Sequence, residues 1–169
     1  MRLSFSSSQA ARPRRSTAAF GAAVGESLTP ETLNATSDQA LRTAGLSANK
    51  LASLRDLSAK VLDGTVVLTR TSRRSDDDLI AGLVTVRGIG RWTAEMYLMF
   101  ELRRLDVWPV DDLGVRQGYG LAWKLDPPPT ATQLEPLGDR FRPYRSVVAR
   151  YCCAAVPLVG ATATDIALR

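Results

Sequence analysis

The chain has 169 residues, of which 45% are apolar, so it can bury one core and is most simply a single domain. Its formal net charge of +5 and its pI near 9.7 favour a polyanionic partner, although many basic proteins bind no nucleic acid. Histidine is absent, and the two cysteines, Cys152 and Cys153, are adjacent. This composition argues against zinc sites, four-cysteine iron–sulfur clusters and a disulfide framework.

The distribution of apolar residues argues against a membrane protein. No apolar run approaches the roughly 20 residues that a membrane-spanning helix needs. The arginines near the N-terminus have no apolar signal core between them. We therefore expect a soluble, monomeric protein of the reducing cytoplasm, associated with the nucleoid if it is bacterial.

The two ends of the chain differ in composition from its middle. Residues 1–16 are rich in serine and arginine and predict a basic, disordered arm, and residues 161–169 form a tail. Between them, residues 17–160 are expected to form one helical domain. Its first helix is predicted from Thr17 to Val24, ending at Gly25.

Three helices with recognisable start and stop residues come next. Thr29 and Pro30 begin a short helix, Ser37 to Gly45 forms another, and Ser47 to Gly64 forms a longer one. Three basic residues of the long helix fall off its apolar stripe, which indicates a solvated face: Lys50, Arg55 and Lys60.

Ser75 and the three aspartates after it begin the next helix. A serine cap and acidic residues in the first turn complement the positive end of the helix dipole. Residues 76–78 also look like a metal cluster, but consecutive carboxylates point in different directions on a helix. The sequence therefore favours capping over metal binding.

The rest of the chain predicts further helices and no sheet. The β-branched run Thr65–Leu68 is short and has no partner strand, which favours an extended connector. Because no alternating strands are found, the predicted fold class is all-α. The later helices are predicted at Trp92–Leu102, Asp112–Trp123, Thr132–Leu137 and Ser146–Val156.

The turn between two of these helices has the composition of a phosphate site. Gly88 and Gly90 allow successive backbone amides to face one point, and the next helix adds its unpaired N–H groups and dipole. Arg87 and Arg91 flank the turn. A single Gly-x-Gly is also common in ordinary helix–helix turns, so the phosphate interpretation depends on the residues that surround this one.

The turn and an acidic loop downstream of it resemble a known family. Residues Val86–Ala94, which read Val-Arg-Gly-Ile-Gly-Arg-Trp-Thr-Ala, resemble the helix-hairpin-helix of the base-excision DNA glycosylases. Residues Trp108–Gly114 resemble the Gly/Pro-rich loop that ends in the catalytic aspartate of that superfamily. The similarity extends from about Leu28 to about Tyr151 and is closest to the DNA-3-methyladenine glycosylase II branch.

The resemblance implies a helix-hairpin-helix glycosylase fold and hydrolysis of the bond between alkylated purines, such as 3-methyladenine, and double-stranded DNA. No cofactor is required. A fixed carboxylate stabilises the oxocarbenium character of the sugar and helps to deprotonate water. The matching position is Asp112, which we favour over Asp111. One carboxylate of the pair is also expected to cap the helix that starts at Leu113.

Two further assignments come from the resemblance. Relatives that cut the strand carry a nucleophilic lysine where this chain has Trp92, which implies a monofunctional enzyme. Trp92 and Met96, one helical turn apart, are expected to line the base pocket, or else to be plain core. Family members also bind a monovalent cation through hairpin carbonyls, here those of Val84, Val86 and Ile89.

The chain also departs from the family pattern. Members usually have two or more helices before the matched part, so we expect an N-terminally truncated or altered start. Arg150 and Cys153 stand where tryptophans are common. These departures leave two alternatives: a non-catalytic DNA-binding module or inactive remnant, and a helical protein-interaction module.

Overall fold

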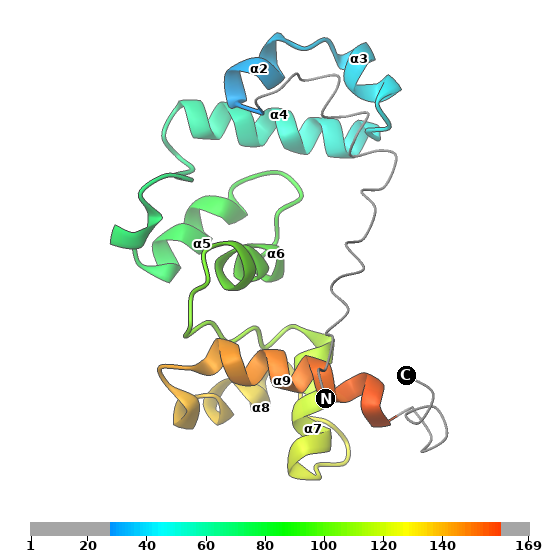
Figure 1. The fold of residues 1–169 in the computed structure, drawn as a ribbon, viewed down its shortest axis with the longest axis vertical. Coiled ribbons are helices and arrows are strands. Elements are labelled where there is room, and N and C mark those ends of the chain that lie inside the picture. The colour runs from blue at the N-terminus through cyan, green and yellow to red at the C-terminus, as the bar shows by residue number, and fades with distance from the viewer. Residues whose placement is uncertain (1–27, 160–169) are drawn as a thin grey trace, which may run out of the picture. The chain divides into compact units, whose positions relative to one another are not determined.

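The computed structural model describes residues 28–159, and every regular element within that range is a helix or a short helical turn (Figure 1). The predicted arm, the helix Thr17–Val24 and the tail 161–169 lie outside the described residues. The all-α prediction is confirmed for the described part. Its elements are α2 (Pro30–Ala35), α3 (Asp38–Thr43), α4 (Ala48–Leu62), η1 (Thr71–Arg73), α5 (Asp76–Val84), α6 (Arg91–Met96), η2 (Tyr97–Glu101), α7 (Leu113–Trp123), α8 (Ala131–Leu137), η3 (Asp139–Phe141) and α9 (Arg145–Val159).

Side-chain caps explain why the helices begin where the sequence predicts. Thr29 and Ser37 accept hydrogen bonds from the third amide of α2 and of α3, and Ser47 does the same for α4. Ser75 accepts from the Asp78 amide at 3.1 Å, so the three aspartates occupy the first turn of α5. Within residues 28–159 no three His, Cys, Asp or Glu side chains are grouped so that they could hold a metal ion.

The described residues fall into two compact units. Unit 1 comprises the described residues up to Val66 together with Val86–Gly88. In it, α2 and α3 both contact α4 around a small apolar core of Leu33, Leu41 and Leu51 (Figure 1). The burial of these three leucines fixes the two short helices on the long one.

Arg55 of α4 is not the solvated base that the sequence predicts. Its guanidinium pairs with Asp38 at 2.6 Å and also donates to the backbone carbonyls of Leu33 and Thr36. These carbonyls lie in the last turns and at the C-cap of α2, where helices leave acceptors unpaired. Arg55 therefore ties α2 and α3 to α4.

Unit 2 comprises Val67–Thr85 and the described residues from Ile89 onward. Within it, α5 packs on α6, and α7 packs closely against α9 (Figure 1). A cluster of four aromatic side chains joins α7 to the segments around it: Trp108, Tyr119, Trp123 and Phe141.

The helix predicted as Trp92–Leu102 changes type along its length. Its first part is the α-helix α6, and its second part, η2, is a π turn in which the Leu102 amide donates to the Tyr97 carbonyl at 3.1 Å. Hydrophobic periodicity does not reveal a π turn. The turn adds one residue to the helix and displaces the apolar pattern by one position, which is too little to recognise in a short helix. The three-residue turns η1 and η3 were not predicted, since they are too short to show a period.

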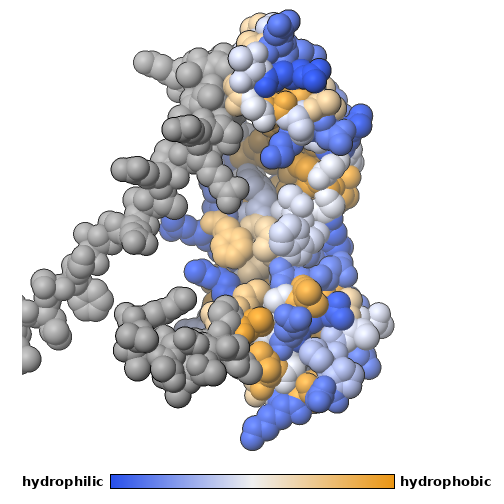
Figure 2. Space-filling model, turned by 90° about the vertical axis from the view of Figure 1, so that its right-hand side faces the viewer, coloured by the Kyte–Doolittle hydropathy of each residue, from blue (hydrophilic) through white to orange (hydrophobic). Residues whose placement is uncertain are grey.

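The surface of the described residues combines hydrophilic and hydrophobic side chains. Figure 2 shows separate hydrophobic patches between hydrophilic residues on the face drawn. Large apolar side chains that are exposed include Trp92, Phe100 and Leu113. Within residues 28–159 no helix has the length and apolar character that a bilayer crossing requires.

Candidate active site

The hairpin turn joins the end of α5 to the start of α6. Gly88 has a φ of 80°, in the left-handed region that favours glycine. Gly90 has an extended backbone, with φ −90° and ψ 171°, which any residue can adopt. A Cβ at Gly90 would have no atom within 4 Å, so Gly90 leaves open space in front of α6 rather than a strained turn.

The N-terminus of α6 offers unpaired amides. Gly90 is the N-cap of α6, and no side chain of the described residues caps this helix. The Gly90 carbonyl accepts the first intrahelical bond, from Ala94 at 3.1 Å, so the preceding amides have no partner within the helix. The predicted phosphate residues Gly88, Gly90 and Arg91 are therefore parts of one turn that opens a helix.

One side of the turn is held by a carboxylate that the sequence did not single out. The Arg87 amide donates to Asp56 Oδ2 at 2.7 Å, and Lys60 pairs with the same carboxylate at 2.8 Å. The hydrogen bond from Lys60, followed by that from the Arg87 amide, lowers the pKa of Asp56. Asp56 and Arg87 are 31 positions apart in the sequence, so no local pattern predicts this hydrogen bond.

Asp112 is both the cap of α7 and the acceptor of a bond from the hairpin helix. Its Oδ1 accepts from the Val115 amide at 3.0 Å, and its Oδ2 accepts from the Trp92 indole Nε1–H at 2.7 Å. Cys153 Sγ lies 3.7 Å from Oδ1. The expected capping role thus belongs to Asp112 itself, while Asp111 is exposed and lines a different cavity.

A small cavity of about 150 Å³ adjoins Asp112. Its lining combines apolar side chains with a guanidinium and a thiol: Met96, Met99, Phe100, Val115, Arg150 and Cys153. Met96 therefore lies on the same cavity as Asp112. Trp92 is bonded to Asp112 and is 48% exposed, so it is not the plain core residue of the alternative interpretation.

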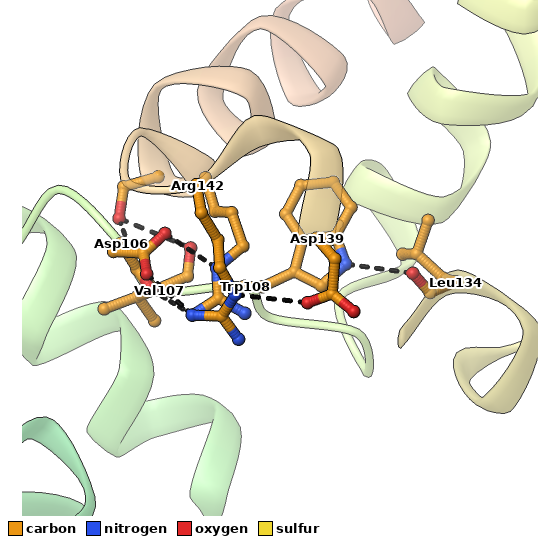
Figure 3. A network of polar contacts seen from close by, with 8 residues as sticks. Asp106, Val107, Trp108, Leu134, Asp139 and Arg142 are labelled. Carbon is orange, nitrogen blue, oxygen red and sulfur yellow. Dashed lines mark hydrogen bonds and ion pairs between the residues drawn. The ribbon is translucent and has the colours of Figure 1, made fainter. Parts of the chain in front are cut away.

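The loop before Asp112 is fixed by side chains from the last helices. Figure 3 shows Arg142 between Asp106 and Asp139, with the indole N–H of Trp108 directed at the Leu134 carbonyl. The Trp108 bond is 3.0 Å long and buried. Gly138 makes room for this indole, because a Cβ there would lie 2.5 Å from Trp108 Nε1.

Asp106, at the start of the same loop, pairs with a second arginine. Arg145 donates to both carboxylate oxygens and to the backbone carbonyl of Asp106, at 2.7 to 3.1 Å. Burial works against the charged form, but the bonds from Arg145 and the nearby charge of Arg142 lower the pKa of Asp106. Ser146 Oγ accepts from the Val107 amide at 2.9 Å. These contacts fix the loop that leads to Asp112.

The thiols near the cavity are protonated at neutral pH. Burial, followed by the charge of Asp112, raises the pKa of Cys153 to about 11, and burial followed by the charge of Cys153 does the same for Cys152. The thiolate is the nucleophilic form of cysteine. Cys153 is therefore a weak donor beside Asp112 and not a nucleophile.

Glu95 is a buried carboxylate that the sequence pattern did not reveal. Its side chain is 3% exposed, and its Oε1 accepts from Arg91 Nε at 3.0 Å. The buried Oε2 has no hydrogen-bond partner among the described residues. Burial, which outweighs the attraction of Arg91, raises the pKa of Glu95, and the charges of Asp111 and Asp112 add to the rise. The side chain of Arg91, in contrast, is 60% exposed.

The Glu95→Gln substitution should make stability less dependent on pH. The pKa of Glu95 is raised in the folded protein, so this carboxyl group stabilises the fold most below its ordinary pKa of 4.5, where it is protonated. That stabilisation is lost as pH rises through the folded-state pKa. A neutral glutamine avoids the buried charge. We expect the variant to be more stable than wild type near pH 7 by on the order of 1 kcal/mol, with no advantage near pH 4.

Thermal unfolding between pH 4 and pH 8 measures this effect. Glu135→Gln is the matched control, since Glu135 is exposed and its substitution should leave the pH dependence as in wild type. A Glu95→Gln variant that is less stable than wild type at every pH would mean that the attraction of Arg91 outweighs the cost of burial.

Comparison with known proteins shows the family to which the chain belongs. Residues 7–143 match the family described as HhH-GPD superfamily base excision DNA repair protein. The matched range begins nearer the N-terminus than Leu28, where the similarity was expected to begin. The DNA-3-methyladenine glycosylase 1 of Schizosaccharomyces pombe is 35% identical over 128 residues. That alignment covers 75% of this chain and 56% of the relative, so the chain spans a little over half of the relative's length.

Two solved structures are similar in fold. The S. pombe 3-methyladenine DNA glycosylase in complex with abasic DNA is 31% identical, with a TM-score of 0.73, over 88% of this chain and 73% of that chain. The DNA-3-methyladenine glycosidase of Bacillus halodurans is 31% identical, with a TM-score of 0.79, over 86% of this chain and 68% of that chain. The resemblance found in the hairpin and the acidic loop is confirmed, and the chain belongs to the HhH-GPD superfamily of base excision DNA repair proteins.

Proposed function

We propose that the chain is a monofunctional DNA glycosylase that hydrolyses the N-glycosidic bond of alkylated purines of the 3-methyladenine type. The observation that carries the proposal is the bond of 2.7 Å from Trp92 on the hairpin helix to Asp112 at the start of α7. This hydrogen bond joins the hairpin helix, whose N-terminal amides can bind a DNA phosphate, to the carboxylate that can stabilise the sugar cation. The names of the relatives support the reaction class.

Asp112 is the catalytic carboxylate of this proposal. The Val115 amide and the Trp92 indole each hold one of its oxygens, so the carboxylate has a fixed position. A fixed negative charge near the anomeric carbon stabilises the oxocarbenium character that develops as the base leaves, and it can help to deprotonate the attacking water. Trp92 cannot form a Schiff base with the sugar, so the strand is left uncut.

Double-stranded DNA is the proposed partner, bound by one copy of the chain. The similar S. pombe structure is a complex with abasic DNA. In this chain, the amides after Gly88 and Gly90 and the exposed guanidinium of Arg91 would take a backbone phosphate. The net charge of +5 favours the same partner.

The damaged base would leave the stack to be cleaved and enter the Asp112 cavity. Met96 lines this cavity, and the exposed ring of Trp92 stands beside the carboxylate. An aromatic face attracts a cationic methylated purine by stacking and cation–π interaction. Such a base is already positively charged and needs little acid assistance to leave.

No cofactor is needed for this hydrolysis, and a structural monovalent cation at the hairpin remains a prediction. Carbonyl oxygens are suitable ligands for such an ion. The carbonyls of Val84, Val86 and Ile89 accept none of the backbone hydrogen bonds found outside the helices within residues 28–159. These oxygens are therefore available to a monovalent cation.

Release of free 3-methyladenine from methylated duplex DNA tests the proposal. The expected products are the free base and an uncut strand with an abasic site. Salt-dependent duplex binding without an abasic product would instead identify a DNA-binding module or inactive remnant. Absence of both binding and release would favour the protein-interaction module.

The Trp92→Phe substitution tests the bond that carries the proposal. Phenylalanine keeps an aromatic ring but has no N–H for Asp112 Oδ2. Because a hydrogen bond to a charged group contributes about 1.5–3 kcal/mol, we expect the single-turnover rate to fall by about 10- to 100-fold. Trp123→Phe is the control, since Trp123 stacks on Tyr119 instead and should leave the rate near wild type. Equal rates for both variants would contradict the role of the indole N–H.

A further inference from the structure

A second cavity of unit 2, here called the acidic cavity, measures about 730 Å³. This volume lies in the usual range of small-molecule sites. The acidic cavity shares no lining residue with the cavity beside Asp112. Six carboxylates and four guanidiniums line it, so the acidic groups are in excess by two: Asp76, Asp77, Glu95, Asp106, Asp111 and Glu135, with Arg91, Arg104, Arg142 and Arg145.

The guanidiniums of the acidic cavity already have carboxylate partners. The pairs, with N···O distances of 2.7 to 3.2 Å, are Arg91–Glu95, Arg104–Asp76, Arg142–Asp106 and Arg145–Asp106. Three of the carboxylates, in contrast, form no hydrogen bond or ion pair within residues 28–159: Asp77, Asp111 and Glu135. The groups left without a partner are acidic, so the cavity suits a cation and not an anion.

Glu95 adds a buried oxygen to these acidic groups. Its side chain is 3% exposed, and Arg91 bonds only to its Oε1. The buried Oε2 has no hydrogen-bond partner in the described part of the chain. Burial raises the pKa of Glu95 despite the attraction of Arg91, so the charge of this carboxylate is compensated only in part. Since an unpaired buried acceptor costs free energy, a cationic N–H donor in the cavity would stabilise the protein.

The carboxylates that need a partner are spread around the cavity. They come from four elements: Asp77 from α5, Glu95 from α6, Asp111 from the loop before α7 and Glu135 from α8. No three acidic side chains within residues 28–159 are grouped so that they could hold one metal ion. A ligand with several positive charges along a chain therefore fits these carboxylates better than a single ion does. Ile80, Val107 and Trp108 provide apolar walls for the methylene groups of such a chain.

We propose that the acidic cavity binds a linear polyamine, in which short methylene chains join ammonium groups. One ammonium group donates to Glu95 Oε2, and the others lie beside Asp77, Asp111 and Glu135. The formal net charge of the whole chain is +5, so its overall field disfavours a cation and the attraction is local. This binding is independent of the proposed function, because it needs neither DNA nor base release.

Isothermal titration of the full chain with spermidine, in the absence of DNA, tests the proposal. We expect wild type to bind spermidine in a saturable manner and Glu95→Gln to bind it at least about tenfold more weakly, as loss of a charge-assisted bond predicts. Glutamine keeps the shape of the side chain and an acceptor for Arg91, so the variant should fold. Glu101→Gln is the matched control, because it removes the same charge from an exposed residue outside the cavity and should bind like wild type.

Thermal unfolding gives a second measurement. Spermidine should raise the melting temperature of wild type and of Glu101→Gln more than that of Glu95→Gln, because a ligand of the folded state stabilises that state. An equal rise with Mg²⁺ at the same ionic strength would mean that spermidine acts only by screening, and it would overturn the proposal. Tighter binding of a lysine tripeptide than of spermidine would indicate a basic protein segment as the occupant and would overturn the choice of a polyamine.

Three results of the titration would also overturn the proposal: no saturable binding by wild type, equal affinities of wild type and Glu95→Gln, or a loss in Glu101→Gln as large as in Glu95→Gln. Release of 3-methyladenine is measured separately. A chain that binds spermidine as expected but releases no base would contradict the proposed function alone.

Discussion

Asp112→Asn should lower the single-turnover rate of 3-methyladenine release by at least about 100-fold, the usual minimum for loss of a catalytic acid or base. The substitution keeps the helix cap but removes the charge and one acceptor oxygen. Asparagine is as good a helix cap as aspartate, so it can still accept from the Val115 amide and begin α7. It lacks the negative charge that stabilises the sugar cation, and its NH2 group cannot accept the bond that the Trp92 indole donates to Asp112 Oδ2.

Asp111→Asn is the matched control, because it removes the same charge one residue earlier. Asp111 is exposed and does not line the Asp112 cavity, so its loss should leave most of the activity. Thermal unfolding and circular dichroism establish that both variants are folded. If Asp111→Asn were the inactive variant and Asp112→Asn the active one, the catalytic role would move to Asp111.

Gly118→Ala should destabilise the protein by about 3 kcal/mol or more, above the usual cost of an extra methyl group in a packed interior. Gly118 is buried where α7 packs on α9. A Cβ there would lie 1.9 Å from the Cys152 carbonyl oxygen and 2.7 Å from the Cys152 Cα. Because these are backbone atoms, α9 as a whole would have to move away from α7.

The expected loss corresponds to a fall in melting temperature on the order of 10 °C. Gly90→Ala is the control for stability, since its Cβ meets no atom within 4 Å and its backbone is extended. It should cost less than about 1 kcal/mol, the ordinary difference between glycine and alanine at a helix cap. A Gly118→Ala variant as stable as Gly90→Ala would show that α7 and α9 can move apart at little cost in free energy.

The sequence predicts the helices well because their signals are local. Caps such as Ser75 act within three residues, and hydrophobic periodicity acts within a few turns, so both can be recognised in a short segment. The π turn at Tyr97–Glu101 cannot be recognised in this way because it changes a hydrogen-bond pattern without changing the types of residue.

Bonds between distant residues could not be predicted. Twenty positions separate Trp92 from Asp112, and no feature of either neighbourhood reveals that the indole donates to the carboxylate. The order of hairpin and acid was informative only because a family uses that order. Arg55 shows the same limit, since its carbonyl partners on another helix cannot be recognised from its own helix.

Glu95 was missed for a further reason. It lies four residues after Arg91, the spacing of an ordinary surface ion pair on a helix. Only the packing around α6 determines that one partner is 3% exposed and the other 60%. Burial is a property of the assembled helices, so a sequence pattern predicts the pair but not the unequal surroundings of its two charges.

The wide turn of η2 decides where this part of the chain tolerates a change in length. A π turn holds one residue more than an α-helical turn, so a deletion within Tyr97–Glu101 would be absorbed by a return to regular α-helix. A deletion within α6, which has no extra residue, would instead rotate everything after it by about 100° about the helix axis. The next loop would leave the helix in another direction and carry Asp112 away from Trp92. Among relatives of this chain, natural deletions should therefore be rarer within α6 than within Tyr97–Glu101.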